Sequence, residues 1–181
     1  MRALIVYESM FGGTRAIAEA IAQGLEPDVA ARVVPVAEAD ATVLDSVDLL
    51  VVGGPTHAWS MSRPSTRKGA PAHASKPDSG LVLEAGADTG PGVREWLESM
   101  GQPDLPGAAF DTRVKGPALF TGRASRAIKR SLSHHGVALV VPPQSFLVDK
   151  KSHLLPGETA RARAWGAQLA AAVERTASYQ G

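Results

Sequence analysis

The sequence predicts an α/β fold in which a mostly parallel sheet carries helices on both faces. Two apolar runs, Ala3–Tyr7 and Leu49–Gly53, have strand length and no polar interruption, as is typical of parallel strands covered on both sides. Segments with helical spacing alternate with strand-like runs from end to end, which favours right-handed crossovers between parallel strands. Ligands of such sheets bind beyond the carboxyl ends of the strands, so the loops that start near Glu8, Gly54 and Thr112 matter most.

In the N-terminal half, the Ala3–Tyr7 strand is followed by a predicted helix, Thr14–Leu25. Its apolar residues Ile17, Ala18, Ile21, Ala22 and Leu25 share one face, and Gly24 and Pro27 mark its exit. A second short strand is expected at Ala31–Val36, one helical turn at Ala41–Ser46, and a third strand at Leu49–Gly53.

In the C-terminal half, Pro91–Met100 is a predicted helix with Pro91 in its first position, and Ala108–Thr112 is a predicted fourth strand. Arg123–His135 reads as a helix closed by Gly136. We expect a fifth strand at Val137–Val141 that continues as Ser145–Asp149 beyond two prolines. The last helix is predicted at 158–177, with these side chains inward: Ala162, Trp165, Leu169, Ala172 and Val173.

The segment Ser60–Gly90 interrupts this alternation. It is basic and rich in Ser, Ala, Gly and Pro, and at about 30 residues it exceeds the usual length of a connection, so we expect it to be functional or mobile. Neither flank of this segment has enough strands for its own core. Residues 1–181 are therefore predicted to form a single domain.

Composition excludes several classes of function. There is no cysteine among the 181 residues, which excludes disulfides and thiolate chemistry. A net charge of +1 gives no support for a nucleic-acid partner. No apolar run approaches the roughly 20 residues of a membrane helix, and the start of the chain lacks the features of a signal peptide. We therefore expect a cytoplasmic protein without membrane insertion. The five histidines have no convincing ligand spacing, so no metal site is predicted.

The turn between the first strand and the first helix is a predicted anion site. It consists of Ser9, Met10, Phe11, Gly12, Gly13 and Thr14. Free N–H groups and the helix dipole attract an anion there, the glycines allow a close approach to the main chain, and two hydroxyls add donors. The motifs of dinucleotide and nucleoside triphosphate sites are absent, so a terminal phosphate monoester is favoured. A glycine turn in which Thr14 only caps the helix is the structural alternative.

The stretch V-Y-E-S-M-F-G-G-T-R-A-I-A resembles the phosphate-binding turn of the flavodoxin family, usually S/T-x-T-G-x-T. Ser9, Gly12 and Thr14 match this pattern, whereas Phe11 and Gly13 replace residues that are often polar. The resemblance covers nearly the whole chain in element order. It implies a flavodoxin-like, doubly wound sheet of five strands in the order 2-1-3-4-5 that binds FMN. A receiver domain, which shares the alternation, is set aside because Glu8 has no acidic neighbours there.

The resemblance also implies two loops that hold the flavin ring. L-L-V-V-G-G-P-T-H-A-W-S matches the loop along one side of the ring, and A-A-F-D-T-R matches the fourth strand and the start of a second ring loop, Thr112–Gly122. The implied ring-binding residues are Pro55, Thr56, His57, Ala58, Trp59, Thr112, Arg113 and Val114. Trp59 is the best candidate for stacking on the ring; the alternative is a surface tryptophan packed under Ser60–Gly90. No catalytic residue is predicted.

Cations gather in or beside the expected ring loops: Arg63, Arg67, Lys68, Arg113, Lys115 and Arg123. Because nearby cations stabilise an added negative charge, we expect a flavin here to be less strongly reducing than in acidic carrier flavodoxins. The implied function is FMN-dependent electron transfer with a redox partner protein. One alternative is an NAD(P)H oxidoreductase that reduces a quinone, with Arg63–Lys76 as a basic lid; menaquinone-dependent protoporphyrinogen oxidases are related to this class. Another is a degenerate interaction domain that has lost FMN.

Overall fold

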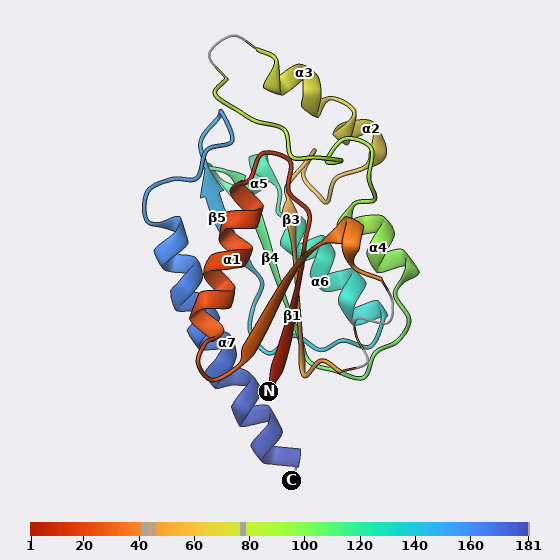
Figure 1. Ribbon diagram of the computed structural model, residues 1–181, viewed down its shortest axis with the longest axis vertical. Coiled ribbons are helices and arrows are strands. Elements are labelled where there is room, and N and C mark those ends of the chain that lie inside the picture. The colour runs from red at the N-terminus through yellow and green to blue at the C-terminus, as the bar shows by residue number, and fades with distance from the viewer. Residues whose placement is uncertain (41–43, 45, 77–78, 181) are drawn as a thin grey trace.

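A computed structural model describes residues 1–40, 44, 46–76 and 79–180 of the chain. Within these residues, a parallel sheet has five strands in the order β2-β1-β3-β4-β5 (Figure 1). The strands are β1 (Arg2–Tyr7), β2 (Ala30–Pro35), β3 (Leu49–Pro55), β4 (Gly107–Val114) and β5 (Gln144–Val148). The predicted fold class and strand order are thereby confirmed.

Helices cover both faces of the sheet, as the alternation predicted (Figure 1). The helices are α1 (Gly13–Leu25), α2 (Pro64–Arg67), α3 (Ala70–Ala74), α4 (Val93–Ser99), α5 (Ala118–Thr121), α6 (Ala124–His134) and α7 (Glu158–Gln180), with a 3-10 turn, η1 (Val36–Glu38). One core packs α1 and α7 against the sheet around Phe110 and Trp165, and the other packs α4 and α6 around Leu97 and Ile128. Alternate strand residues supply the two cores.

The register of the sheet brings the expected ligand-binding ends together. Tyr7 at the end of β1 pairs with Gly53 of β3, and Pro55 pairs with Thr112 of β4. The segments that follow β1, β3 and β4 therefore leave the same edge of the sheet side by side. This is the edge at which strand order reverses between β1 and β3, the usual ligand position in such folds.

Three predicted boundaries were wrong. Val137–Val141 is not a strand: Leu139 forms only an isolated bridge to Gly107, and β5 begins after Pro142 and Pro143, which lack the N–H groups that a ladder needs. Pro91 is not in the first helical position, because α4 begins at Val93. Thr112–Val114 belong to β4, so the loop that was expected from Thr112 begins at residue 115.

The other elements appear close to the predicted positions. Gly136 follows α6 with a φ of 82°, in the left-handed region that the closing glycine requires. The expected helical turn at Ala41–Ser46 lies largely outside the described residues. Ser60–Gly90 contains α2 and α3, which are too short for the periodicity of the sequence to indicate.

Candidate functional site

The phosphate turn, Ser9–Thr14, ends in an uncapped helix N-terminus. Gly12 has a left-handed φ of 83°, which glycine adopts without steric cost. No side chain caps α1, and the first helical hydrogen bond runs from Ala16 N to Gly12 O at 2.9 Å. The N–H groups of residues 13–15 therefore precede the hydrogen-bond ladder of the helix. Together with the helix dipole they leave free donors at the turn where the sequence predicts an anion site.

Hydroxyl groups border this turn. Ser9 Oγ accepts a hydrogen bond from Gly12 N–H at 3.1 Å, so the Ser9 hydroxyl hydrogen can still be donated elsewhere. Thr14 Oγ1 and Thr112 Oγ1 lie 2.8 Å apart, and both residues are buried. Only one hydroxyl of this pair can donate to the other, so the second hydrogen remains available for a ligand oxygen. Thr14 is therefore not a side-chain cap of its own helix.

The loop after β3 is a two-residue hairpin that presents Trp59. His57 and Ser60 exchange two backbone hydrogen bonds, of 2.8 and 3.0 Å. Between them, Ala58 and Trp59 both have positive φ, 44° and 67°, as the two central residues of a type I′ turn require. Non-glycine residues adopt this conformation at a cost, which recurs at functional sites. Trp59 is 64% exposed, so it is not packed under Ser60–Gly90.

Backbone contacts fix the hairpin against the loop that follows β4. Trp59 forms a parallel bridge with Gly122, whose φ is 74°. A Cβ atom on Gly122 would lie 2.2 Å from Trp59 Cα, so only glycine fits there. Thr56 Oγ1 accepts a hydrogen bond from Ala124 N–H at 3.0 Å, and Thr56 N–H donates to Thr112 O at 2.8 Å. The two loops expected to hold a ring are thus joined.

Most of the predicted site residues line one narrow cleft of about 80 Å³. The predicted residues in its wall are Met10, Phe11, Gly13, Thr14, Pro55, Thr56, His57, Thr112, Arg113 and Val114. Ser9, Gly12, Ala58 and Trp59 do not line it. Val148 and Ser152 were missed by the sequence analysis; the end of β5 lies at the ligand edge, a signal that could have found Val148. Burial lowers the pKa of His57, which favours its neutral form.

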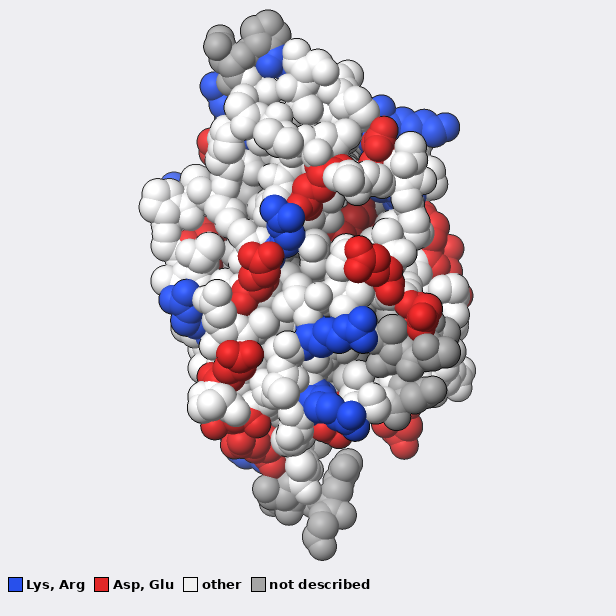
Figure 2. Space-filling view, in the orientation of Figure 1, with Lys and Arg blue, Asp and Glu red and all other residues white. Residues whose placement is uncertain are grey.

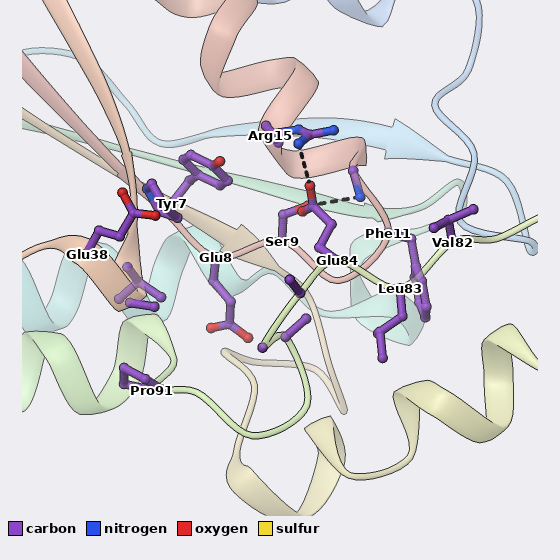
Figure 3. Close-up of a pocket in the computed structure, with 17 residues that line it drawn as sticks. Tyr7, Glu8, Ser9, Phe11, Arg15, Glu38, Val82, Leu83, Glu84 and Pro91 are labelled. Carbon is purple, nitrogen blue, oxygen red and sulfur yellow. Dashed lines mark hydrogen bonds and ion pairs between the residues drawn. The ribbon is translucent and has the colours of Figure 1, made fainter.

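Phe11 also lines a larger cavity, of about 640 Å³, whose lining residues are drawn in Figure 3. Its floor is formed by the ends of β1 and β2, and residues 82–87 form another wall. Glu84 N–H donates to Met10 O at 2.9 Å, and the Glu84 carboxylate forms an ion pair with Arg15 at 3.1 Å. The long segment is therefore docked on the phosphate turn, a contact that no local pattern indicated.

Glu8 is a buried carboxyl group between the phosphate turn and the long segment. It is 4% exposed, and its Oε2 accepts a hydrogen bond from Val93 N–H at 2.9 Å, at the start of α4. Oε1 has no hydrogen-bond partner among the described residues. Burial raises the pKa of Glu8, while the nearby Ser62 hydroxyl and the Arg67 charge oppose the shift.

Asp111 is the corresponding group on the ring side of the cleft. It is fully buried near the end of β4, and its Oδ2 accepts a hydrogen bond from Ser125 N–H at 2.8 Å, in the first turn of α6. Burial raises the pKa of Asp111 as well. Glu8 thus covers the N-terminus of α4, and Asp111 covers that of α6.

One residue of the expected basic lid faces inward. Arg67 is 3% exposed, forms an ion pair with Glu95 at 3.0 Å and donates to Ser62 Oγ at 3.0 Å. Glu95 neutralises the charge of the buried Arg67, so Arg67 anchors the long segment instead of facing a ligand. Arg63, Lys68 and Lys76 remain exposed.

The residues that the structure describes include no cluster of His, Cys, Asp and Glu able to hold a metal ion. No helix formed by them is both long and apolar enough to cross a membrane.

Comparisons with known proteins agree with this geometry. The sequence model of the flavodoxin family matches residues 5–61, which include the phosphate turn and the hairpin at Trp59. A search of curated proteins found no match. Among solved structures, a flavodoxin from the domain Archaea is 20% identical, with a TM-score of 0.66 and coverage of 96% of this chain and 99% of the other.

Two further solved structures show the same fold. Flavodoxin 1 from Bacillus cereus is 16% identical, with a TM-score of 0.61 and coverage of 97% of this chain and 98% of the other. A flavodoxin described as WrbA-like from Agrobacterium tumefaciens is 18% identical, with a TM-score of 0.57 and coverage of 96% and 98%. The chain therefore has a flavodoxin-like fold, and its residues 5–61 match the flavodoxin family model.

Proposed function

We propose that this protein binds FMN and transfers electrons with a protein partner. The observation that carries the proposal is the convergence of an uncapped helix N-terminus and two joined loops on one cleft, at the edge where strand order reverses. The N–H groups of residues 13–15 and the hydroxyls of Ser9 and Thr14 would hold the phosphate. Pro55–Trp59 and Thr112–Val114 would hold the ring.

The donor set of the turn fits a phosphate monoester, because N–H groups and hydroxyls are all hydrogen-bond donors and no carboxylate lines the cleft. The cleft of about 80 Å³ is far smaller than the roughly 300–1,000 Å³ of small-molecule pockets, so it must widen for the ring. Trp59 does not line the cleft in this structure, but it is 64% exposed and follows the wall residues Thr56 and His57 closely in the chain. We therefore propose that the ring lies against Trp59.

FMN supplies the electron transfer when it is bound. The residues of this chain would hold the phosphate and orient the ring. The basic residues at the end of β4 and after it would favour added negative charge on the ring.

A flavodoxin-like domain without flavin is the second candidate, and the narrow cleft is the observation that favours it. The NAD(P)H oxidoreductase alternative is weakened, because Arg67 of the expected lid is buried in an ion pair with Glu95.

Titration of the flavin-free protein with FMN, and in parallel with riboflavin, tests the proposal through quenching of flavin fluorescence. We expect FMN to bind at micromolar or lower concentration and riboflavin to bind much more weakly. If neither ligand binds, the flavin-free candidate replaces the proposal. If both bind equally, the phosphate is held elsewhere.

A further inference from the structure

Residues 112–148 contain six Lys and Arg and no Asp or Glu. The whole chain has 19 basic and 18 acidic residues. The remainder of the chain therefore has 13 basic residues against all 18 acidic ones. The net charge of +1 is therefore an average over a strongly basic stretch, residues 112–148, and an acidic remainder. The basic stretch begins at the ring side of the cleft and includes α6.

The six cations are Arg113, Lys115, Arg123, Arg126, Lys129 and Arg130. None of them forms an ion pair with any residue in the described part of the chain. Arg126, Lys129 and Arg130 lie on the exposed face of α6, opposite the buried Ile128 and Leu132. They extend along a helix of 11 residues, about 16 Å long. The charges of Arg126, Lys129 and Arg130 therefore face solvent without an ion-pair partner among the described residues.

Apolar side chains project beside these cations. Leu119 and Phe120 on α5 are 82% and 71% exposed. Trp59 is 64% exposed and is held next to the same loop by its bridge to Gly122. Trp59, Leu119 and Phe120, which come from the two ring loops, thus make up half of the six large apolar side chains exposed in the described part of the chain. Exposed apolar residues rimmed by polar ones are typical of an interaction site.

The face seen in Figure 2, over α1 and β2, has a different charge pattern. Basic and acidic side chains are intermingled there, and Arg15 lies within 4 Å of both Glu19 and Glu84. A mixed surface attracts neither sign strongly, whereas an unbroken basic surface steers acidic molecules toward it.

We propose that loop 115–122 and the exposed face of α6 form a docking surface for an acidic protein. Leu119 and Phe120 stand at its apolar centre, and the six cations form its rim. Four of these cations are arginines, and a tryptophan stands beside them, a composition typical of protein interfaces. The role of this docking surface rests on the proposed function. Because the surface borders the proposed flavin site, the acidic protein that fits it is a redox partner.

The test uses soluble cytochrome b5, a strongly acidic haem protein, as the probe. Its binding to the flavin-free protein and to protein saturated with FMN is measured by calorimetry between 20 and 200 mM NaCl, concentrations chosen to span strong and weak screening. We expect binding at low salt that weakens steeply as salt is added. The K129E/R130E variant should lose at least about tenfold in affinity.

The matched control is R2E/R32E, which changes the net charge equally at two exposed arginines of β1 and β2. It should lose less than about twofold, because these residues lie off the docking surface. The L119S/F120S variant should lose affinity while keeping the salt dependence of the wild type, because apolar contacts are not screened. Wild-type affinity in the charge-conserving variant K129R/R130K would confirm that the partner recognises the positive charge at these positions and not the particular side chain.

Three results would overturn the docking surface: no binding at 20 mM NaCl, an equal loss in R2E/R32E, or tighter binding of the protein to vesicles of anionic phosphatidylserine with the same variant pattern. The last result would assign the surface to a membrane. Because binding of cytochrome b5 is also measured with flavin-free protein, the docking proposal and the FMN proposal can fail independently of each other. Cytochrome b5 binding without FMN binding leaves the docking surface intact, and FMN binding without cytochrome b5 binding leaves the cofactor proposal intact.

Discussion

The two sides of the cleft differ in how far apart their residues lie in the sequence. The phosphate turn uses consecutive residues, 9–14, and its anion site follows from a glycine and an uncapped helix start. The ring side joins Thr56 to Ala124, which are 68 positions apart, and the Trp59 hairpin to Gly122. A local site is set by its own backbone, whereas an assembled site depends on tertiary contacts. Substitutions should therefore affect the ring side most at the point where its two loops meet.

Gly122→Ala should have the largest effect on flavin binding. The added Cβ would lie 2.2 Å from Trp59 Cα, and the φ of 74° is strained for alanine, so the two ring loops must separate. We expect FMN and riboflavin affinity to fall together, by on the order of 100-fold if about 3 kcal/mol is lost. Fluorescence titration of both ligands measures this.

The matched control is Gly136→Ala, which has a similar φ of 82° but no atom within 4 Å of the added Cβ. This variant should lose stability because alanine is strained at a positive φ, and its flavin affinity should be unchanged. Equal loss in both variants would show that the meeting of the loops is not what holds the ring.

The two buried carboxyl groups allow a comparison of stability on the two sides. Burial raises the pKa of both Glu8 and Asp111 in the folded state. At a pH between the pKa of such a group in the unfolded state and its pKa in the folded state, the folded state therefore binds more protons than the unfolded state. The free energy of unfolding should therefore fall as the pH rises through that window, by about 1.4 kcal/mol for each unit of separation.

Urea unfolding of Glu8→Gln and Asp111→Asn between pH 4 and pH 8 tests this sign. Each amide keeps an oxygen that accepts the hydrogen bond from the helix N–H but does not titrate. Each variant should therefore lose the contribution of its own carboxyl group to the slope of the unfolding free energy against pH, and the double variant should lose both contributions. Variants that keep the wild-type slope would contradict the prediction.

Thr14→Val should act only on the phosphate side. The substitution keeps the shape and removes a hydroxyl, with an expected cost of about 1–2 kcal/mol for a charge-assisted hydrogen bond. FMN affinity should fall by roughly tenfold while riboflavin affinity stays constant. Thr112→Val breaks the same 2.8 Å contact but keeps the Thr14 hydroxyl, so its effect on FMN should be smaller. Loss of riboflavin binding in Thr14→Val would place the residue on the ring side instead.

Local and assembled features also differ in how well the sequence predicted them. The phosphate turn was predicted because consecutive residues determine both its glycine spacing and the start of the following helix. The pairing of Trp59 with Gly122, the burial of Arg67 against Glu95, and the contact of Glu84 with Met10 all join distant segments, and no periodicity carries such information. The displaced β5 is different: the double proline before it was visible, and its lack of N–H donors should have had more weight.

Trp59→Leu should have a moderate effect confined to the ring. Stacking of aromatic faces contributes about 0.5–1.5 kcal/mol beyond area burial, so both FMN and riboflavin should bind about twofold to tenfold more weakly. Trp59→Phe keeps an aromatic face and should restore part of the affinity. Unchanged titrations in Trp59→Leu would mean that the exposed indole serves the docking surface alone.

Lys115→Gln should give the smallest effect, on the reduction potential of bound FMN. Lys115 is exposed and lies just beyond Val114, a proposed ring-binding residue, and its charge should favour added electrons. Water screens an exposed charge, so we expect the potential to fall by on the order of 10 mV. Spectroelectrochemical titration compares this variant with Arg32→Gln on β2, whose potential should match the wild type. A higher potential in Lys115→Gln, or an equal fall in Arg32→Gln, would show that the basic residues after β4 do not set the potential and serve partner docking only.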